Sequence, residues 1–103
     1  MISAKEAKEI SRNNQVEIQR LSEIAYNEVI LNIELEIKKE SLLGNYQANF
    51  SLVPIAKLNE TSNEAAKRSV HMVAGRLREK GYSFETFTNF NVSSTIYWDK
   101  VYP

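Results

Sequence analysis

The first 43 residues contain neither proline nor glycine, and this long uninterrupted stretch constrains the fold more than any other feature. Ser3 followed by Glu6 matches a capping box, in which the serine hydroxyl accepts a hydrogen bond from a free N–H group of the first helical turn. Gly44 supplies the left-handed backbone conformation that commonly ends a helix. The sequence therefore predicts a helix over residues 4–43, either continuous or broken once near residues 13–15.

A competing pattern lies inside this stretch, because residues 29–38 partly alternate in hydropathy with the period of two that is typical of a strand. The helical spacing of Tyr26, Ile30, Ile33 and Ile37, at i, i+4, i+7 and i+11, favours a helix instead. Leucine and glutamate, which are good helix formers, flank these residues. We therefore expect a helix here, with this stripe facing the core.

A second apolar stripe projects from roughly the opposite side of the same helix and consists of Ile24, Leu31, Leu35 and Leu42. A helix that covers a sheet needs only one apolar stripe, so the second must meet something else. The alternatives are the second helix or the chain's own N-terminal arm, a further copy of the chain, or a partner protein. We expect a homo-oligomer in which this stripe meets itself across a two-fold axis.

The rest of the chain alternates between strand and helix patterns. Residues 46–53 alternate in hydropathy as a strand with one buried face does, and Pro54 ends that strand. Residues 55–60 are expected to form a connector. Thr61 or Ser62 can then cap a second helix that runs through Lys80 and ends at Gly81. Its predicted core stripe is Ala66, Val70, Val73 and Leu77.

Two further alternating segments, residues 82–88 and 94–101, predict a C-terminal hairpin with a turn at residues 89–91. The chain is therefore expected to be one domain, residues 1–103, with an α+β fold in the order α-β-α-β-β. The long N-terminal helix and the second helix would pack on one face of a three-stranded antiparallel sheet. Some of the C-terminal aromatic residues are expected on the open face of that sheet: Tyr82, Phe84, Phe87, Phe90, Tyr97, Trp98 and Tyr102.

Composition argues against several classes of function. Thirteen basic residues balance thirteen acidic ones, so the overall attraction to nucleic acid or to an anionic membrane is missing. With no cysteine and one histidine, thiol catalysis is excluded, and no metal or other cofactor is expected. No motif pairs a nucleophile with a base, so we expect a protein that is not an enzyme. The N-terminus lacks a signal peptide, and no apolar run spans a membrane, so an intracellular location is expected.

One local constellation could bind an anionic ligand. Helical periodicity places Lys67, Arg68, His71 and Arg78 on the side of the second helix that faces away from its core stripe. Arginine suits bidentate contact with phosphate or carboxylate, and histidine adds a charge that changes near neutral pH. The alternative is an ordinary solvated helix face, whose positive charge Glu64 and Glu79 would reduce.

Four segments together resemble short proteins of tailed bacteriophages. They are residues 1–7 (MISAKEA), the helix with Ile30, Ile33 and Ile37 that leads into residues 44–46 (GNY), residues 76–82 (RLREKGY) and residues 94–98 (STIYW). The resemblance implies a phage origin and an α+β fold, and it assigns no catalytic or binding residue. It favours an accessory protein that binds and inhibits or sequesters a host or defence component, either a protein or a small anionic ligand, in the host cytoplasm. The alternative is a structural component of the virion, buried between capsid or tail subunits.

Overall fold

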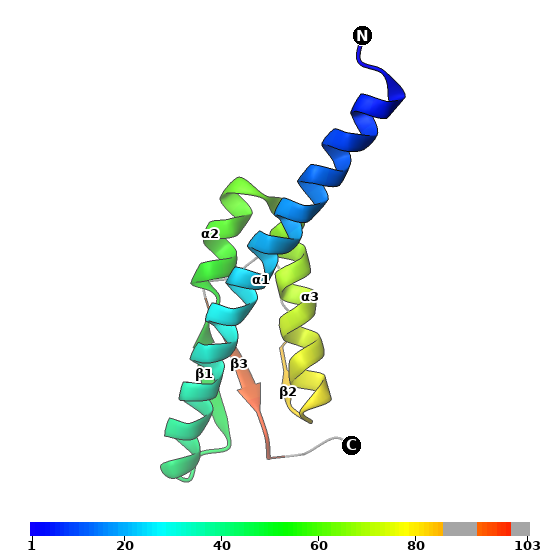
Figure 1. Cartoon of the computed structure of the whole chain (residues 1–103). Coiled ribbons are helices and arrows are strands. Elements are labelled where there is room, and N and C mark those ends of the chain that lie inside the picture. Colours follow the sequence, from blue (N-terminus) through cyan, green and yellow to red (C-terminus); the bar gives the residue numbers. More distant parts are fainter. Residues whose placement is uncertain (86–92, 100–103) are drawn as a thin grey trace.

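The N-terminal helix, α1 (Ala4–Leu42), is continuous over 39 residues and runs the length of the molecule (Figure 1). The computed structural model describes residues 1–85 and 93–99. The Ser3 hydroxyl accepts a hydrogen bond of 3.1 Å from the Glu6 N–H, as the capping box predicts. The helix has no break near residues 13–15, and the alternating segment 29–38 is helical.

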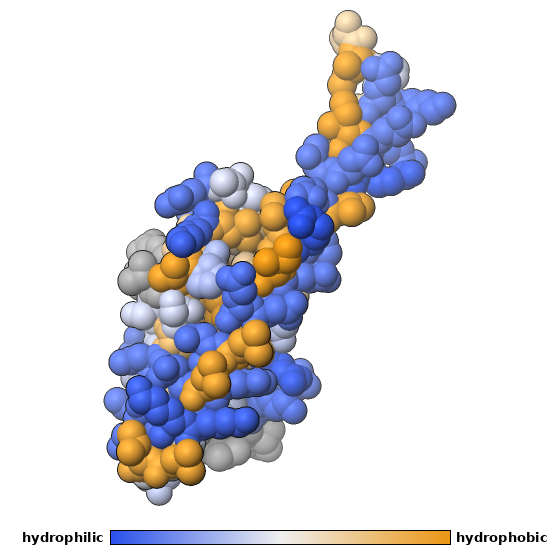
Figure 2. Space-filling view, turned by 60° about the vertical axis from the view of Figure 1, so that its left-hand side comes forward, coloured by the Kyte–Doolittle hydropathy of each residue, from blue (hydrophilic) through white to orange (hydrophobic). Residues whose placement is uncertain are grey.

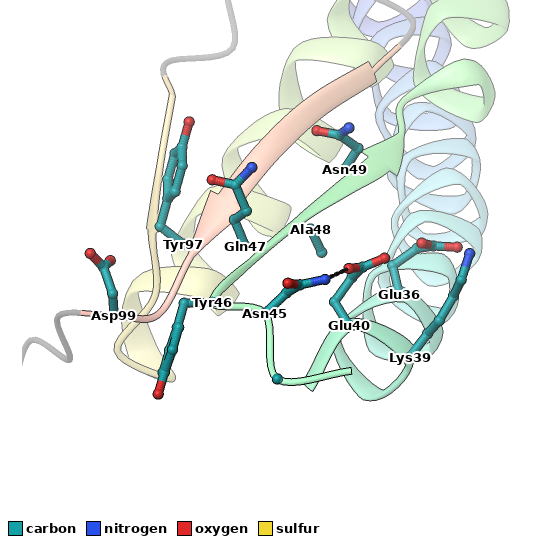
Figure 3. A pocket seen from close by; sticks show the side chains of 11 residues that line it. Glu36, Lys39, Glu40, Asn45, Tyr46, Gln47, Ala48, Asn49, Tyr97 and Asp99 are labelled. Atoms are coloured by element: carbon teal, nitrogen blue, oxygen red, sulfur yellow. Dashed lines mark hydrogen bonds between the residues drawn. The ribbon is translucent and has the colours of Figure 1, made fainter. Parts of the chain in front are cut away.

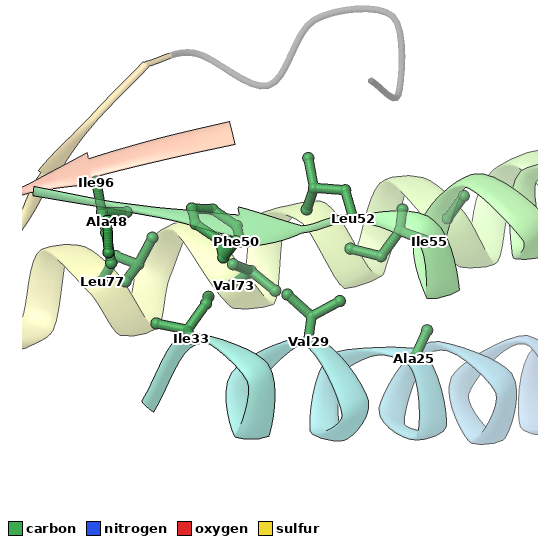
Figure 4. Close-up of a cluster of buried hydrophobic side chains, with 11 residues drawn as sticks. Ala25, Val29, Ile33, Ala48, Phe50, Leu52, Ile55, Val73, Leu77 and Ile96 are labelled. Carbon is green, nitrogen blue, oxygen red and sulfur yellow. The ribbon is translucent and has the colours of Figure 1, made fainter. Parts of the chain in front are cut away.

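Five shorter elements follow α1: β1 (Gln47–Ser51), α2 (Val53–Thr61), α3 (Asn63–Glu79), β2 (Ser83–Phe84) and β3 (Ser93–Tyr97). The strands form one antiparallel sheet in the order β1-β3-β2, and α1 and α3 lie on one side of it (Figures 1 and 4). In the central strand, Ile96 pairs with Ala48 on one side and with Phe84 on the other. The predicted α+β class and three-stranded sheet are confirmed. The predicted turn at residues 89–91 lies outside the described residues.

Residues 55–60 do not form a connector, and this expectation is wrong. They belong to α2, so the order of elements is α-β-α-α-β-β. Pro54 lies in the first turn of that helix, where its fixed φ fits helical geometry and its missing N–H costs nothing. Ser62 then ends α2 and caps α3, because its hydroxyl accepts a hydrogen bond of 3.3 Å from the Ala65 N–H.

The two long helices, α1 and α3, end with the same backbone motif. Gly44 has a φ of 81° and Gly81 has a φ of 86°, which side chains with a Cβ rarely adopt. The N–H of the residue after each glycine donates to the carbonyl of Glu40 or of Leu77, at 2.9 and 3.0 Å. This hydrogen bond satisfies a carbonyl that the helix end would otherwise leave unpaired, and it explains why the glycines predict both boundaries.

The core lies between the sheet and the inner sides of α1 and α3 (Figure 4). Val73 and Leu77 are buried as predicted. On α1 the buried apolar positions are Ala25, Val29 and Ile33, and the other members of the predicted stripe lie at the margin of the core: Tyr26, Ile30 and Ile37. The inner side of α1 is therefore turned slightly from the predicted direction, although Ile33 belongs to both sets.

Small residues meet where α1 packs against α3. Ser22 and Ser69 are both fully buried, and the Ser69 hydroxyl lies 3.1 Å from the Ser22 carbonyl and 2.9 Å from that of Ala65. Small side chains let the two helix backbones approach closely. The hydroxyl is satisfied within the core, so its burial carries little penalty.

Most of the described C-terminal aromatic residues turn inward. Tyr82, Phe84 and Trp98 pack against the core, and the rings of Tyr82 and Trp98 meet edge to face with centroids 6.1 Å apart. Tyr97 lies on the opposite, open face beside Gln47 (Figure 3). The predicted aromatic open face is therefore reduced to Tyr97 in the part of the hairpin that the structure describes. Three of the residues expected there lie outside that part: Phe87, Phe90 and Tyr102.

Candidate functional site

The second apolar stripe of α1 is exposed. We call Ile24, Leu31, Leu35 and Leu42 the outer face of α1; their exposed fractions are 45%, 62%, 67% and 88%. At 100° per residue they lie within about 40° of one another around the helix, on the side away from the core. Figure 2 shows apolar side chains in separate patches along the length of the molecule, with polar side chains between them. The helix α3, which corresponds to the predicted second helix, does not cover this stripe.

Two charged residues, Glu28 and Lys38, lie between the apolar members of the outer face and are also exposed. In the part of the chain that the structure describes, neither forms an ion pair. Hydropathy alone does not single out these two residues, because both are charged. The spacing of 24, 28, 31, 35, 38 and 42 along one helix was the signal that could have found them.

The N-terminal part of α1 extends past the other elements (Figure 1). It carries further exposed apolar side chains, Ile2, Ile10 and Val16, with exposed fractions between 50% and 66%. Contact with the body of the protein begins at Gln15 and Gln19, whose side-chain oxygens accept hydrogen bonds from the Arg68 guanidinium. The alternative in which the chain's own N-terminal arm covers the outer face of α1 is not seen.

The four predicted anion-binding residues do not share one environment. Lys67 and His71 are exposed on α3. Arg68 turns toward α1 and lies 3.8 Å from Glu64, and the Arg78 guanidinium lies 5.3 Å from the centre of the Phe84 ring. Both arginines thus have contacts within the protein, which an anion would have to share or displace.

A hollow of about 660 Å³ lies at the end of the molecule where α1 turns into β1 (Figure 3). Its described lining includes three carboxylates, Glu36, Glu40 and Asp99, and a single cation, Lys39. Asn45 Nδ2 donates to Glu40 Oε2 at 2.7 Å. The described lining contains no histidine, serine or threonine, so it lacks the hydroxyl and imidazole pair of a common hydrolytic site.

Tyr97, which also lines that hollow, has a raised pKa. Desolvation and the nearby Glu85 carboxylate raise the pKa of Tyr97 above its ordinary value, and Tyr97 Oη donates to Glu85 Oε1 at 3.3 Å. A tyrosine with a raised pKa stays protonated near neutral pH and acts as a hydrogen-bond donor. The hollow therefore presents polar and acidic groups to solvent.

Two further features bear on the class of site. Within residues 1–85 and 93–99, no three histidine, cysteine, aspartate or glutamate side chains lie close enough together to hold a metal ion. No helix in that part of the chain combines the length and the apolar character needed to cross a bilayer.

Comparison of the chain with protein-family models, with curated proteins and with solved structures finds no match.

Proposed function

We propose that this protein acts by binding another protein rather than by catalysis, and that the outer face of α1 is its contact surface. One observation carries the proposal: four large aliphatic side chains are aligned on a single continuous helix, opposite the core, and are between 45% and 88% exposed. Large apolar side chains that stay exposed in a row along one helix are typical of interaction sites in folded proteins. A continuous helix also presents the side chains at fixed spacing, which lowers the entropy lost on binding.

The resemblance to short proteins of tailed bacteriophages gives this binding a biological setting. The protein is then an accessory protein that binds and inhibits or sequesters a component of the host or of its defences in the host cytoplasm. A protein partner fits better than a small anionic ligand, because Arg68 and Arg78 are engaged by groups of the protein itself. Stoichiometric binding of this kind needs no catalytic group.

A photo-crosslinking experiment tests this function. A photoreactive amino acid at position 35 should form crosslinks from the outer face of α1 in infected cells, whereas one at the exposed Lys67 position on α3 should not. Leu35→Glu, which places a charge on the outer face, should abolish copurification of the partner and leave the circular dichroism spectrum unchanged. A partner that Leu35→Glu retains at full yield would move the binding surface away from α1.

The elongated shape favours a second candidate, a structural component of the virion. The molecule extends 62 Å along its longest axis, and the N-terminal part of α1 projects with apolar side chains exposed. Such a segment can insert between neighbouring subunits of an assembly. Quantitative mass spectrometry of purified particles separates the two candidates, because a virion component is present at a fixed copy number and an accessory protein is absent.

A further inference from the structure

The exposed side of α1 carries a regular seam that is longer than its four aliphatic residues. Positions 24, 28, 31, 35, 38 and 42 follow one another at intervals of four, three, four, three and four. This is the spacing of the a and d positions of a heptad repeat, along which two helices pack side by side. All six side chains are exposed and lie within one continuous helix. The seam is therefore shaped to receive another helix.

The order of residues along this seam is the same in both directions. From the N-terminal end it reads aliphatic, charged, aliphatic, aliphatic, charged, aliphatic, with its midpoint at Ile33. Two such helices laid antiparallel place Ile24 against Leu42 and Leu31 against Leu35. They also place Glu28 of each helix against Lys38 of the other, so every contact joins apolar to apolar or acid to base.

We infer that the first partner of the outer face of α1 is a second copy of this chain, paired antiparallel across a two-fold axis that passes between Leu31 and Leu35. This inference rests on the proposed function, since it names what occupies the same surface. A parallel pair would set Glu28 against Glu28 and Lys38 against Lys38, which is unfavourable. An antiparallel pair shifted by one heptad would set Glu28 against Leu31. The charges therefore specify both direction and register.

Two features of the monomer are consistent with this pairing. The seam ends where α1 ends, at Leu42, so all six positions overlap over about 27 Å of helix. In the described part of the chain Glu28 and Lys38 have no ion-pair partner of their own, so pairing breaks no existing bridge. In the antiparallel pair, like charges approach each other at Glu34, which lies at the edge of the seam and faces its own copy. Glu34 also lines a hollow together with Arg76 and Lys80.

Charge reversal tests the pairing. Glu28→Lys sets two lysines against each other at both ends of the seam, and Lys38→Glu sets two glutamates there. Each should raise the dimer dissociation constant about 10- to 100-fold, as measured by sedimentation velocity, and the double variant should restore it. In a parallel pair neither single change would weaken association. The matched control is Lys67→Glu on α3, which should leave the constant unchanged.

Engineered disulfides test the direction independently, because the chain contains no cysteine. A mixture of Ile24→Cys chains with Leu42→Cys chains should form a crosslinked heterodimer on mild oxidation, since these positions face each other in the antiparallel pair. Ile24→Cys alone should not crosslink. Efficient crosslinking of Ile24→Cys to itself would overturn the antiparallel arrangement.

Failure of this inference can be distinguished from failure of the proposed function. A light-scattering mass near the 11.8 kDa of one chain at tens of micromolar overturns self-pairing. If the photoreactive group at position 35 still crosslinks to a foreign protein, the proposed function stands and the seam belongs to that protein. If the wild type is dimeric but the double charge reversal does not restore association, the pairing exists without the Glu28–Lys38 contacts, and this arrangement is wrong.

Discussion

The two sides of α1 are built from similar residues and have opposite surroundings. Val29 and Ile33 on the inner side are 0% and 2% exposed, whereas Leu31 and Leu35 on the outer side are 62% and 67% exposed. The inner side also includes small residues such as Ala25, which let the helix lie close to the rest of the protein. Hydropathy alone therefore does not tell which side of an apolar helix is the core, whereas side-chain size along each stripe is informative.

The largest expected effect comes from comparing two alanine variants, one on each side of α1. Ile33→Ala should lower the free energy of unfolding by about 2–5 kcal/mol, because it leaves a cavity in the core. Leu35→Ala, two residues away, should leave the unfolding free energy of the monomer almost unchanged and weaken self-association. Urea unfolding at a concentration below the dimer dissociation constant measures the unfolding free energy of both variants, and sedimentation velocity at higher concentration measures self-association. Equal losses for the two variants would show that the sides are not distinct.

A second test addresses the close contact between α1 and α3. Ser69→Val should cost about 1–3 kcal/mol, because the added methyl groups have no space against Ser22 and the buried hydrogen bond is lost. Ser69→Ala, which removes the hydrogen bond without adding bulk, should cost about 1 kcal/mol. Thermal unfolding followed by circular dichroism gives both values. If Ser69→Val is as stable as Ser69→Ala, the helices do not need small residues at this contact.

The smallest expected effect on dimer stability comes from Glu34, at the edge of the outer face of α1. Glu34→Gln removes the like-charge approach near the two-fold axis and should tighten the dimer about twofold at low salt. The gain should disappear in high salt, because exposed charges are screened. Sedimentation velocity at two ionic strengths measures the dimer dissociation constant of the wild type and of Glu34→Gln. A weaker dimer after this change would place Glu34 in a favourable contact and alter the geometry at the axis.

The boundaries of the long helices could be predicted from the sequence because their ends depend on local chemistry. Ser3, Ser62, Gly44 and Gly81 act within a few residues of their own position, so no tertiary information is needed. The misleading alternation over residues 29–38 has an equally local cause. Two residues advance a helix by about 200°, so two apolar stripes on opposite sides of one helix produce nearly the period of a strand.

Other features depend on contacts that are distant in sequence. The helix α2 was missed because Pro54 was interpreted as the end of a strand, although the same residue suits the first turn of a helix. The open face was expected to carry aromatic residues, but Tyr82 and Trp98 turn into the core. The members of the outer face of α1 were predicted, but their exposure depends on where α3 packs.

The position of α1 ahead of its packing partners in the sequence has a consequence for biosynthesis. Its inner side packs against residues that come later in the sequence, from Ala48 to Leu77. Ribosomes add roughly 5–20 residues each second, so Leu77 follows Leu42 by about 2–7 s. During that interval a nascent chain carries a helix with apolar side chains on both sides and no partner for either. Neighbouring chains on one messenger are then close enough to associate, and chaperones that bind exposed apolar segments have their best opportunity before α3 is complete.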